Sequence, residues 1–174
     1  GIDCLTQIPT DDYARIDVQT LEAAFKEEPE TPTLLLLQAG DVNTGGFDDF
    51  ASIIPMARNY NCWIHVDGAF GLWAAASPEC KHLVAGTELA DSWATDGHKW
   101  LNVPYDCGYA FVAHPEAHAN AFAQQAAYLV EVDQARDQVT YNPEFSRRGR
   151  GFATWAVIKE LGKSGIEKLI DRTC

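Results

Sequence analysis

The sequence predicts an α/β fold built on a mainly parallel sheet. Short apolar runs typical of strands alternate with segments of helical spacing, which is the order that βαβ units produce. Several of these runs end in polar or charged residues, and in parallel sheets ligands bind at the carboxyl ends of the strands. The chain has 174 residues, enough to bury a substantial core. The sequence therefore indicates one globular α/β domain with a site at one sheet edge.

The first half of the chain supplies a helix, a strand and a second helix. Residues 17–28 have helical spacing, and Asp17 is placed to cap them. Residues 33–37 (TLLLL) form an uninterrupted apolar run, which predicts a strand buried on both faces. A glycine-containing loop follows over residues 39–46, and an amphipathic helix follows over residues 48–60.

The middle of the chain predicts three more strands. Residues 62–66 (CWIHV) form a strand that ends at Asp67, and residues 78–84 suggest a short helix. Residues 91–95 form the next strand, which runs into a turn containing Lys99. Residues 108–113 (GYAFVA) predict a strand that pairs with it.

The last third of the chain changes character. Residues 122–143 are polar with weak periodicity, and we expect a mobile segment there. Residues 152–161 and 166–170 are helical, joined at residues 162–165.

Composition excludes several classes of function. The net charge of −12 argues against nucleic-acid or anionic-membrane surfaces, which need basic patches. There is no run of 18 apolar residues and no signal-peptide pattern at the start, so we expect a cytoplasmic protein without membrane contact. His65 and Asp67 could be metal ligands, but no third ligand falls at suitable spacing, and we expect no metal site. Reduced thiols are expected for the five scattered cysteines, which are Cys4, Cys62, Cys80, Cys107 and Cys174.

Lys99 and Asp67 are the residues with a possible chemical role. A lysine is usually a solvated surface group, and an aspartate after a strand is often a cap or an ion-pair partner. Lys99, however, lies between His98 and Trp100 at a predicted strand end. An amine in a site that excludes water can have its pKa lowered, which an imine-forming nucleophile requires. Asp67 could hold a ring nitrogen protonated.

Several strings of residues, in order, resemble a known family. They are AGDVNTGGFDD at 39–49, HVDGAF at 65–70, DGHKW at 96–100, LNVPYDCG at 101–108 and FSRRGRG at 145–151. Together they resemble the group II pyridoxal-phosphate decarboxylases, which include aromatic amino-acid, glutamate and tyrosine decarboxylases. The resemblance implies a lyase of fold type I, the aspartate aminotransferase-like fold with a mostly parallel sheet. It also implies pyridoxal 5'-phosphate as cofactor.

Roles follow from the resemblance for four residues near the two key motifs. Lys99 is expected to form a Schiff base with the cofactor, and Asp67 to pair with its pyridine nitrogen. Ala69 is expected to pack beneath the cofactor ring. His98 is expected to lie by the cofactor phosphate and the lysine.

The resemblance assigns roles to four further residues. Asn43 and Thr44 lie in the loop that approaches the ring hydroxyl and the phosphate. Asp48 matches an aspartate that supports a histidine stacked on the ring. Tyr128 aligns with a tyrosine of a mobile loop that delivers a proton during catalysis.

The resemblance also implies limits and alternatives. Residues 1–174 correspond to the C-terminal part of an incomplete large domain, with an N-terminal segment and a C-terminal small domain expected elsewhere in a homodimeric protein. Position 96 is Asp where several relatives have Asn, and a carboxylate there would repel a phosphate. The expected function is release of carbon dioxide from an L-amino acid to give an amine, a carboxy-lyase action on a small-molecule substrate, with aromatic amino acids favoured. Two alternatives stay open: another fold-type I enzyme, such as a lyase or transaminase, or a non-catalytic fragment that lacks the cofactor.

Overall fold

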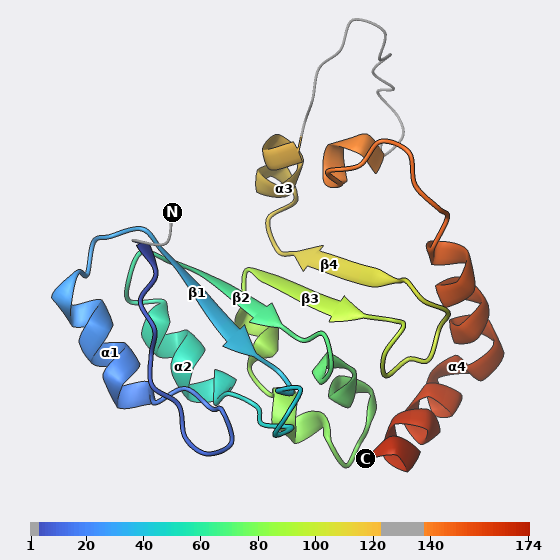
Figure 1. The fold of residues 1–174 in the computed structure, drawn as a ribbon, viewed down its shortest axis with the longest axis horizontal. Coiled ribbons are helices and arrows are strands. Elements are labelled where there is room, and N and C mark those ends of the chain that lie inside the picture. The colour runs from blue at the N-terminus through green and yellow to red at the C-terminus, as the bar shows by residue number, and fades with distance from the viewer. Residues whose placement is uncertain (1–3, 123–137) are drawn as a thin grey trace, which may run out of the picture. The chain divides into compact units, whose positions relative to one another are not determined.

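The computed structural model describes residues 4–122 and 138–174 (Figure 1). The chain divides into two compact units. The larger unit comprises Gly1–Phe111 and Arg150–Cys174, and the smaller one comprises Val112–Gly149. Both key motifs and the sheet, apart from its last residue Val112, belong to the larger unit.

The larger unit is organised around a four-stranded sheet in the order β1-β2-β3-β4. Strands β1 and β2 pair in parallel, and so do β2 and β3. Strand β4 runs in the opposite direction beside β3 (Figure 1). The strands span Thr33–Gln38, Cys62–Asp67, Ser92–Asp96 and Gly108–Val112, respectively. The predicted mainly parallel sheet and its four strands are therefore confirmed.

The strand register brings the carboxyl ends of the three parallel strands to one edge. Asp67, the last residue of β2, is level with Gln38 of β1 and with Ala94 of β3. Strand β3 ends two residues later, at Asp96. The turn with Lys99 therefore begins at the edge where Asp67 lies, as the sequence predicted.

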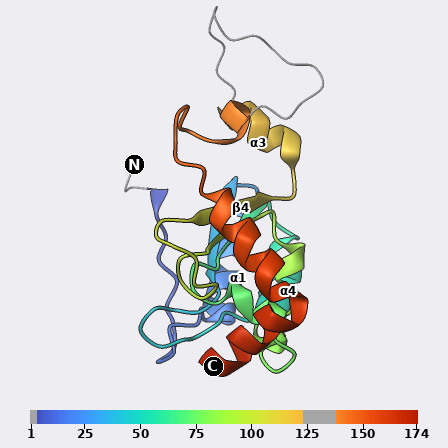
Figure 2. The same cartoon turned by 90° about the vertical axis from the view of Figure 1, so that its right-hand side faces the viewer.

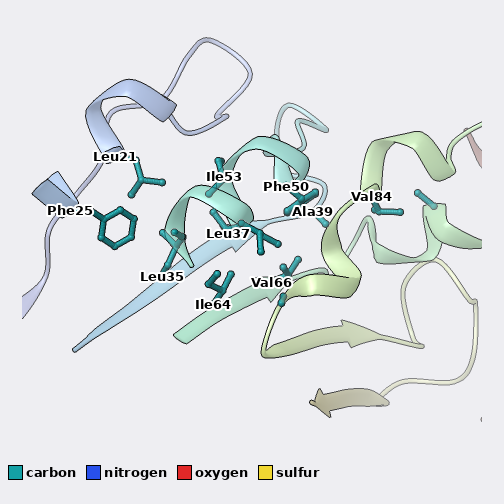
Figure 3. Close-up of a cluster of buried hydrophobic side chains, with 14 residues drawn as sticks. Leu21, Phe25, Leu35, Leu37, Ala39, Phe50, Ile53, Ile64, Val66 and Val84 are labelled. Atoms are coloured by element: carbon teal, nitrogen blue, oxygen red, sulfur yellow. The ribbon is translucent and has the colours of Figure 1, made fainter. Parts of the chain in front are cut away.

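Two helices cover one face of the sheet. Helix α1 spans Val18–Glu27, and the Asp17 side chain caps it by accepting a hydrogen bond from the Thr20 amide at 2.7 Å. Helix α2 spans Phe50–Ala57 and is shorter at both ends than predicted. Their apolar faces meet the inner face of the sheet in the main core (Figure 3). The largest side chains fully buried there are Phe50, Leu37, Ile53, Ile54, Ile64 and Val66.

The prediction that β1 is buried on both faces is wrong. Leu35 and Leu37 are buried against the helices, whereas Leu34 and Leu36 are 61% and 59% exposed. Side chains alternate between the faces of a strand. Helices α1 and α2 cover only one face, and no described element buries the other side of β1. The apolar run gave no sign of this difference because both sets of positions are leucine.

Short 3-10 helices follow β2, and only one was predicted. The helix expected over residues 78–84 is the 3-10 turn η3, which spans Lys81–Val84. Two others, η2 at Leu72–Ala76 and η4 at Thr87–Leu89, had no periodicity to indicate them. Such turns are too short to show a helical repeat.

The last element, α4, spans Gly151–Thr173 and consists of two helical segments that meet at Gly162, as predicted. At Gly162 φ is 59° and ψ is −175°, a conformation that glycine adopts at low cost.

The smaller unit contains two short elements. Helix α3 spans Pro115–Phe122 and was not predicted. A 3-10 turn, η5, spans Gln138–Tyr141, inside the stretch for which the sequence predicted no regular structure. His118 of α3 contacts the ring of Tyr141 at a centroid distance of 5.4 Å, so the two elements pack together.

Helix α4 lies beside the segment that follows β3 (Figure 2), and a second, smaller core fills the space between them. Leu101, Val103 and Cys107 are buried there. Val157 and Ile166 of α4 pack against them. The segment after Lys99 therefore packs against a helix from the far end of the sequence.

Asp48 is expected to be a strong contributor to stability. Its side chain is 5% exposed, and it accepts hydrogen bonds from the amides of Ile16 at 2.8 Å and Gln38 at 2.7 Å. Asp48→Ala leaves both amides without an acceptor and should lower the free energy of unfolding by about 2–4 kcal/mol. Asp49→Ala removes only the cap of α2 and should cost about 1 kcal/mol. Urea unfolding of both variants measures the difference, and equal losses would contradict this role for Asp48.

Candidate active site

Lys99 extends from the turn after β3 toward the turn after β2. Its Nζ lies 2.9 Å from Asp96 Oδ2 and 3.9 Å from the centroid of the Phe70 ring. Phe70 is the third residue after Asp67 in the sequence. A cation over an aromatic face is attracted by the ring quadrupole. The two turns identified from the sequence therefore meet through the amine of Lys99.

Asp67 presents a carboxylate at the same edge. Its Oδ1 accepts a hydrogen bond from the Ala69 amide at 3.0 Å, which fixes the start of the turn. Its Oδ2 accepts none from the residues that the structure describes. The side chain is exposed, and the Asp67 carbonyl accepts from the Ala39 amide at 2.8 Å. Asp67 is thus anchored through its backbone and one oxygen, with the other oxygen able to meet a cation.

The turn that carries Lys99 is closely packed. The Gly97 amide donates to the Cys107 carbonyl at 2.8 Å, and the Gly97 carbonyl accepts from the Val103 amide at 3.0 Å. A Cβ at position 97 would lie 2.2 Å from the hydroxyl of Tyr109, so only glycine fits. That hydroxyl lies 2.5 Å from Thr154 Oγ1 of α4, and burial raises the pKa of Tyr109 to about 12. The tight fit fixes the backbone from which Lys99 extends.

His98 is held beside the Lys99–Asp96 ion pair. Its Nδ1 lies 2.9 Å from both the amide nitrogen and the carbonyl oxygen of Cys107, so the backbone of that residue fixes the ring. Nε2 lies 3.8 Å from Asp96 Oδ2. The centroids of the His98 and Tyr105 rings are 4.0 Å apart. His98 is therefore next to Lys99, as the resemblance implied, while its contact with a phosphate stays a prediction.

The loop with Asn43 and Thr44 is ordered by Asp41. Its Oδ1 accepts from the Thr44 and Asn43 amides, each at 2.9 Å, and these bonds lower the pKa of Asp41. The Thr44 hydroxyl donates to the Tyr13 carbonyl at 2.7 Å. Both residues are exposed. The structure thus shows Thr44 engaged in holding the loop, and the approach of both residues to a cofactor stays a prediction.

The roles expected of Asp48 and Tyr128 both stay predictions. Both carboxylate oxygens of Asp48 bind backbone amides, so its described contacts are structural, and its support of a stacked histidine stays a prediction. Tyr128 lies outside the described residues.

Phe70 and Asp96 are the site residues whose role the sequence did not show. Phe70 was part of the HVDGAF string. An aromatic residue after a strand does not by itself indicate that a cation lies over its ring. Asp96 was considered only as a possible phosphate contact, whereas it is the ion-pair partner of Lys99. Its spacing of three residues before Lys99 is the one signal that could have shown this.

A hydrogen-bonded group lies on the same face of β2 as Asp67. Trp63 Nε1 donates to Ser92 Oγ at 2.9 Å, and His65 Nδ1 lies 2.7 Å from the same oxygen. His65 and Ser92 are cross-strand partners. Burial lowers the pKa of His65, and the negative charge of Asp67 opposes that shift. His65 is thus favoured in its neutral form, two residues before Asp67.

The lowered pKa of His65 predicts a dependence of stability on pH. The unfolded chain takes up a proton at this residue below about pH 6.5, where the folded chain resists it, so stability should fall as pH drops through this range. His65→Gln removes this contribution. Urea midpoints at about pH 7.5 and pH 5.5 should therefore differ less in His65→Gln than in the wild type. An unchanged difference would show that the His65 pKa is not lowered.

Other kinds of site find no support in the described part of the chain. Among residues 4–122 and 138–174, no group of three or more His, Cys, Asp or Glu side chains is placed to hold a metal ion. None of the helices described there has the length and apolar character to cross a membrane.

The family follows from comparison of the whole chain with known proteins. Residues 2–174 match the model of the pyridoxal-dependent decarboxylase conserved domain. The chain belongs to the pyridoxal-dependent decarboxylase family. An aromatic-L-amino-acid decarboxylase of Drosophila lebanonensis is 31% identical over 175 residues, covering 98% of this chain and 43% of the relative. One of Bacillus atrophaeus is 27% identical, covering 96% of this chain and 36% of the relative. The chain therefore spans less than half the length of these relatives.

Solved structures agree with the predicted fold type. The structure of mouse CSAD matches with a TM-score of 0.88 and 26% identity, over 99% of this chain and 37% of the other. The structure of Oryza sativa TDC with PLP and tryptamine has a TM-score of 0.86 and 24% identity, over 94% of this chain and 35% of the other. The mostly parallel fold-type I sheet is thereby confirmed.

The donor set of this pyridoxal-dependent decarboxylase domain fits pyridoxal phosphate, the cofactor of the family. The cofactor has an aldehyde, which an amine can attack, and a ring nitrogen that binds a carboxylate when protonated. Lys99 supplies the amine, and Asp67 supplies a carboxylate with one oxygen unoccupied by described residues. Asp96 is the departure, because a carboxylate 2.9 Å from Lys99 Nζ would repel a phosphate placed beside it. An amine and a carboxylate suited to the aldehyde and the ring nitrogen are thus both present at this edge of the sheet.

Proposed function

We propose that the protein is a carboxy-lyase that removes carbon dioxide from an L-amino acid, with pyridoxal phosphate attached to Lys99. The observation that carries the proposal is the position of Lys99 Nζ. Nζ lies 3.9 Å from the centroid of the Phe70 ring, and Phe70 belongs to the turn that begins with Asp67. An amine and a carboxylate at one edge of a parallel sheet suit a cofactor that needs both. Membership of the pyridoxal-dependent decarboxylase family supports the same reaction.

Four residues would hold the cofactor. Lys99 Nζ would bind it covalently, and Asp67 Oδ2 would pair with its ring nitrogen. Ala69, whose amide is fixed by Asp67, offers a small side chain beneath a flat ring. His98, whose ring is fixed by the Cys107 backbone, would lie beside the bound group. When bound, pyridoxal phosphate accepts the electron pair that remains after carbon dioxide leaves the substrate.

Asp96 would control the proton on Lys99. The amine can act as a nucleophile only when its lone pair is free, so a proton must leave Nζ. Asp96 Oδ2, at 2.9 Å, is within hydrogen-bond reach of that proton. Phe70 would hold Nζ over its ring while the proton is still present. The ion pair is therefore a resting arrangement that has to open before the amine reacts.

Aromatic amino acids are the proposed substrates. The relatives from Drosophila and Bacillus are named aromatic-L-amino-acid decarboxylases. Another relative, from Rhodiola rosea, is named a 4-hydroxyphenylacetaldehyde synthase and is 30% identical over 149 residues, covering 84% of this chain and 30% of the relative. An aldehyde product is therefore the second candidate, and product analysis separates the two.

The experiment is an assay of the full-length protein with a panel of L-amino acids. We expect carbon dioxide and the matching amine in equal amounts from at least one of tyrosine, tryptophan and dihydroxyphenylalanine. Aldehyde and ammonia in place of amine would favour the synthase reaction. Carbon dioxide release from glutamate alone would contradict the proposed substrate class, and keto acid without carbon dioxide would indicate a transaminase.

We further propose that the full-length protein is a cytoplasmic homodimer. Exposed apolar side chains on described elements support an assembly, since patches of this kind usually become buried in a partner. Phe152 and Trp155 at the start of α4 are both exposed, and their rings lie 6.1 Å apart. Light scattering of the purified protein measures its mass, and a monomer at micromolar concentration would contradict this proposal.

A further inference from the structure

Cys80 and Cys174 bring their sulfur atoms to 3.1 Å although 94 residues separate them in the sequence. Cys80 directly precedes η3, and Cys174 directly follows α4. The S–S bond of a disulfide is about 2.05 Å long, so the two atoms need to approach by only about 1 Å. Because the cysteines are scattered, nothing in the sequence paired them.

Ser77 holds the two segments in this position. Its Oγ donates to Asp171 Oδ1 of α4 at 2.5 Å. The same Oγ accepts from the amides of Glu79 at 3.1 Å and Cys80 at 3.0 Å. One hydroxyl therefore fixes both the turn that carries Cys80 and the last turn of α4. Because both backbones are fixed, the sulfur atoms can meet through side-chain rotation.

A second contact ties the same end of α4 to the active-site turn. Trp100 Nε1 donates to Thr173 Oγ1 at 2.5 Å. Thr173 precedes Cys174, and Trp100 follows Lys99. Ile170, one turn earlier in α4, is fully buried. The thiol pair thus lies where α4 supports the backbone of Lys99.

We propose that Cys80 and Cys174 are a redox modification site that forms a reversible disulfide by exchange with glutathione disulfide. The thiolate of Cys80 attacks one sulfur of glutathione disulfide, and one glutathione leaves. Cys174 then loses its proton and attacks the Cys80 sulfur of the mixed disulfide, which releases the second glutathione. Two protein thiols are oxidised, and one glutathione disulfide is reduced to two thiols.

The order of the two attacks follows from the surroundings of Cys174. Cys174 is an exposed residue, but partial desolvation of its thiol and the neighbouring Cys80 sulfur raise its pKa to about 11. Since the thiolate is the nucleophile, Cys174 reacts slowly with an external oxidant at neutral pH. Cys174 is therefore the resolving thiol. It reacts with the mixed disulfide on Cys80 because that sulfur lies close to it. In a reducing compartment such a disulfide is transient, which suits a regulatory pair.

The test is oxidation of the full-length protein with glutathione disulfide, followed by alkylation and digestion without reductant. Mass spectrometry should find the peptide of Cys80 linked to that of Cys174, and dithiothreitol should remove the link. Cys174→Ser should instead leave glutathione on Cys80. Cys62→Ser, which changes a cysteine outside the pair, should keep the link.

Thermal unfolding gives a second measurement. Because the disulfide closes a long loop, the oxidised wild type should melt roughly 5–15 °C above the reduced protein. Cys80→Ser should show no such rise under the same treatment. Alkylation of both Cys80 and Cys174 after full oxidation would overturn the proposal, and so would a link from Cys80 to another cysteine.

Discussion

Lys99→Arg is expected to abolish covalent attachment of the cofactor and to lower decarboxylation by a factor of roughly 10³ or more, as loss of a covalent nucleophile does. Arginine stays protonated, and its guanidinium is a poor nucleophile. The positive charge beside Asp96 and over Phe70 is kept, so the fold should not change. Amine production and the visible absorbance of bound cofactor measure the two effects.

The matched control for this variant is Lys163→Arg. Lys163 is an exposed lysine of α4, and the change again replaces an amine with a guanidinium. It should leave cofactor attachment and turnover at wild-type levels. If Lys99→Arg kept full activity while Lys163→Arg lost it, the lysine would have been assigned wrongly.

Asp67→Asn is expected to weaken cofactor binding about 10- to 100-fold, the range for loss of a charge-assisted hydrogen bond. Turnover of the loaded enzyme should fall by a further factor of roughly 10², because an amide cannot stabilise a positive ring nitrogen. The asparagine oxygen can still accept from the Ala69 amide, so the turn should be preserved. Cofactor titration and amine production separate the two effects.

Glu30→Gln provides the comparison for charge. It removes one negative charge at an exposed position just before β1, at the amino ends of the parallel strands. Cofactor binding should be unaffected by it. Equal weakening in both variants would indicate a general electrostatic effect, and the specific pairing of Asp67 with the ring nitrogen would then be wrong.

The sequence was sufficient to place Lys99 and Asp67 at one edge of a parallel sheet. Both follow predicted strands, and parallel strands bring their carboxyl ends to one edge of a sheet. The register that sets Asp67 level with Ala94 confirms that placement. The strand pattern of the sequence was therefore enough to predict that Lys99 and Asp67 lie at the same edge of the sheet.

Contacts between distant segments could not be predicted in the same way. The position of Phe70 under Lys99 depends on how two turns fold toward each other, and no periodicity encodes it. The exposure of Leu34 and Leu36 depends on which faces helices cover, which a run of leucines does not reveal. The approach of Cys80 to Cys174 depends on the docking of α4, 94 residues later in the chain.

Reduction with borohydride tests the central claim most directly. In the full-length protein loaded with pyridoxal phosphate, reduction makes the bond between the cofactor and its lysine permanent. Digestion and mass spectrometry then identify the modified residue. The account predicts the cofactor on Lys99, in the peptide that contains DGHKW. A modified Lys81, Lys159 or Lys163 with an unmodified Lys99 would contradict it.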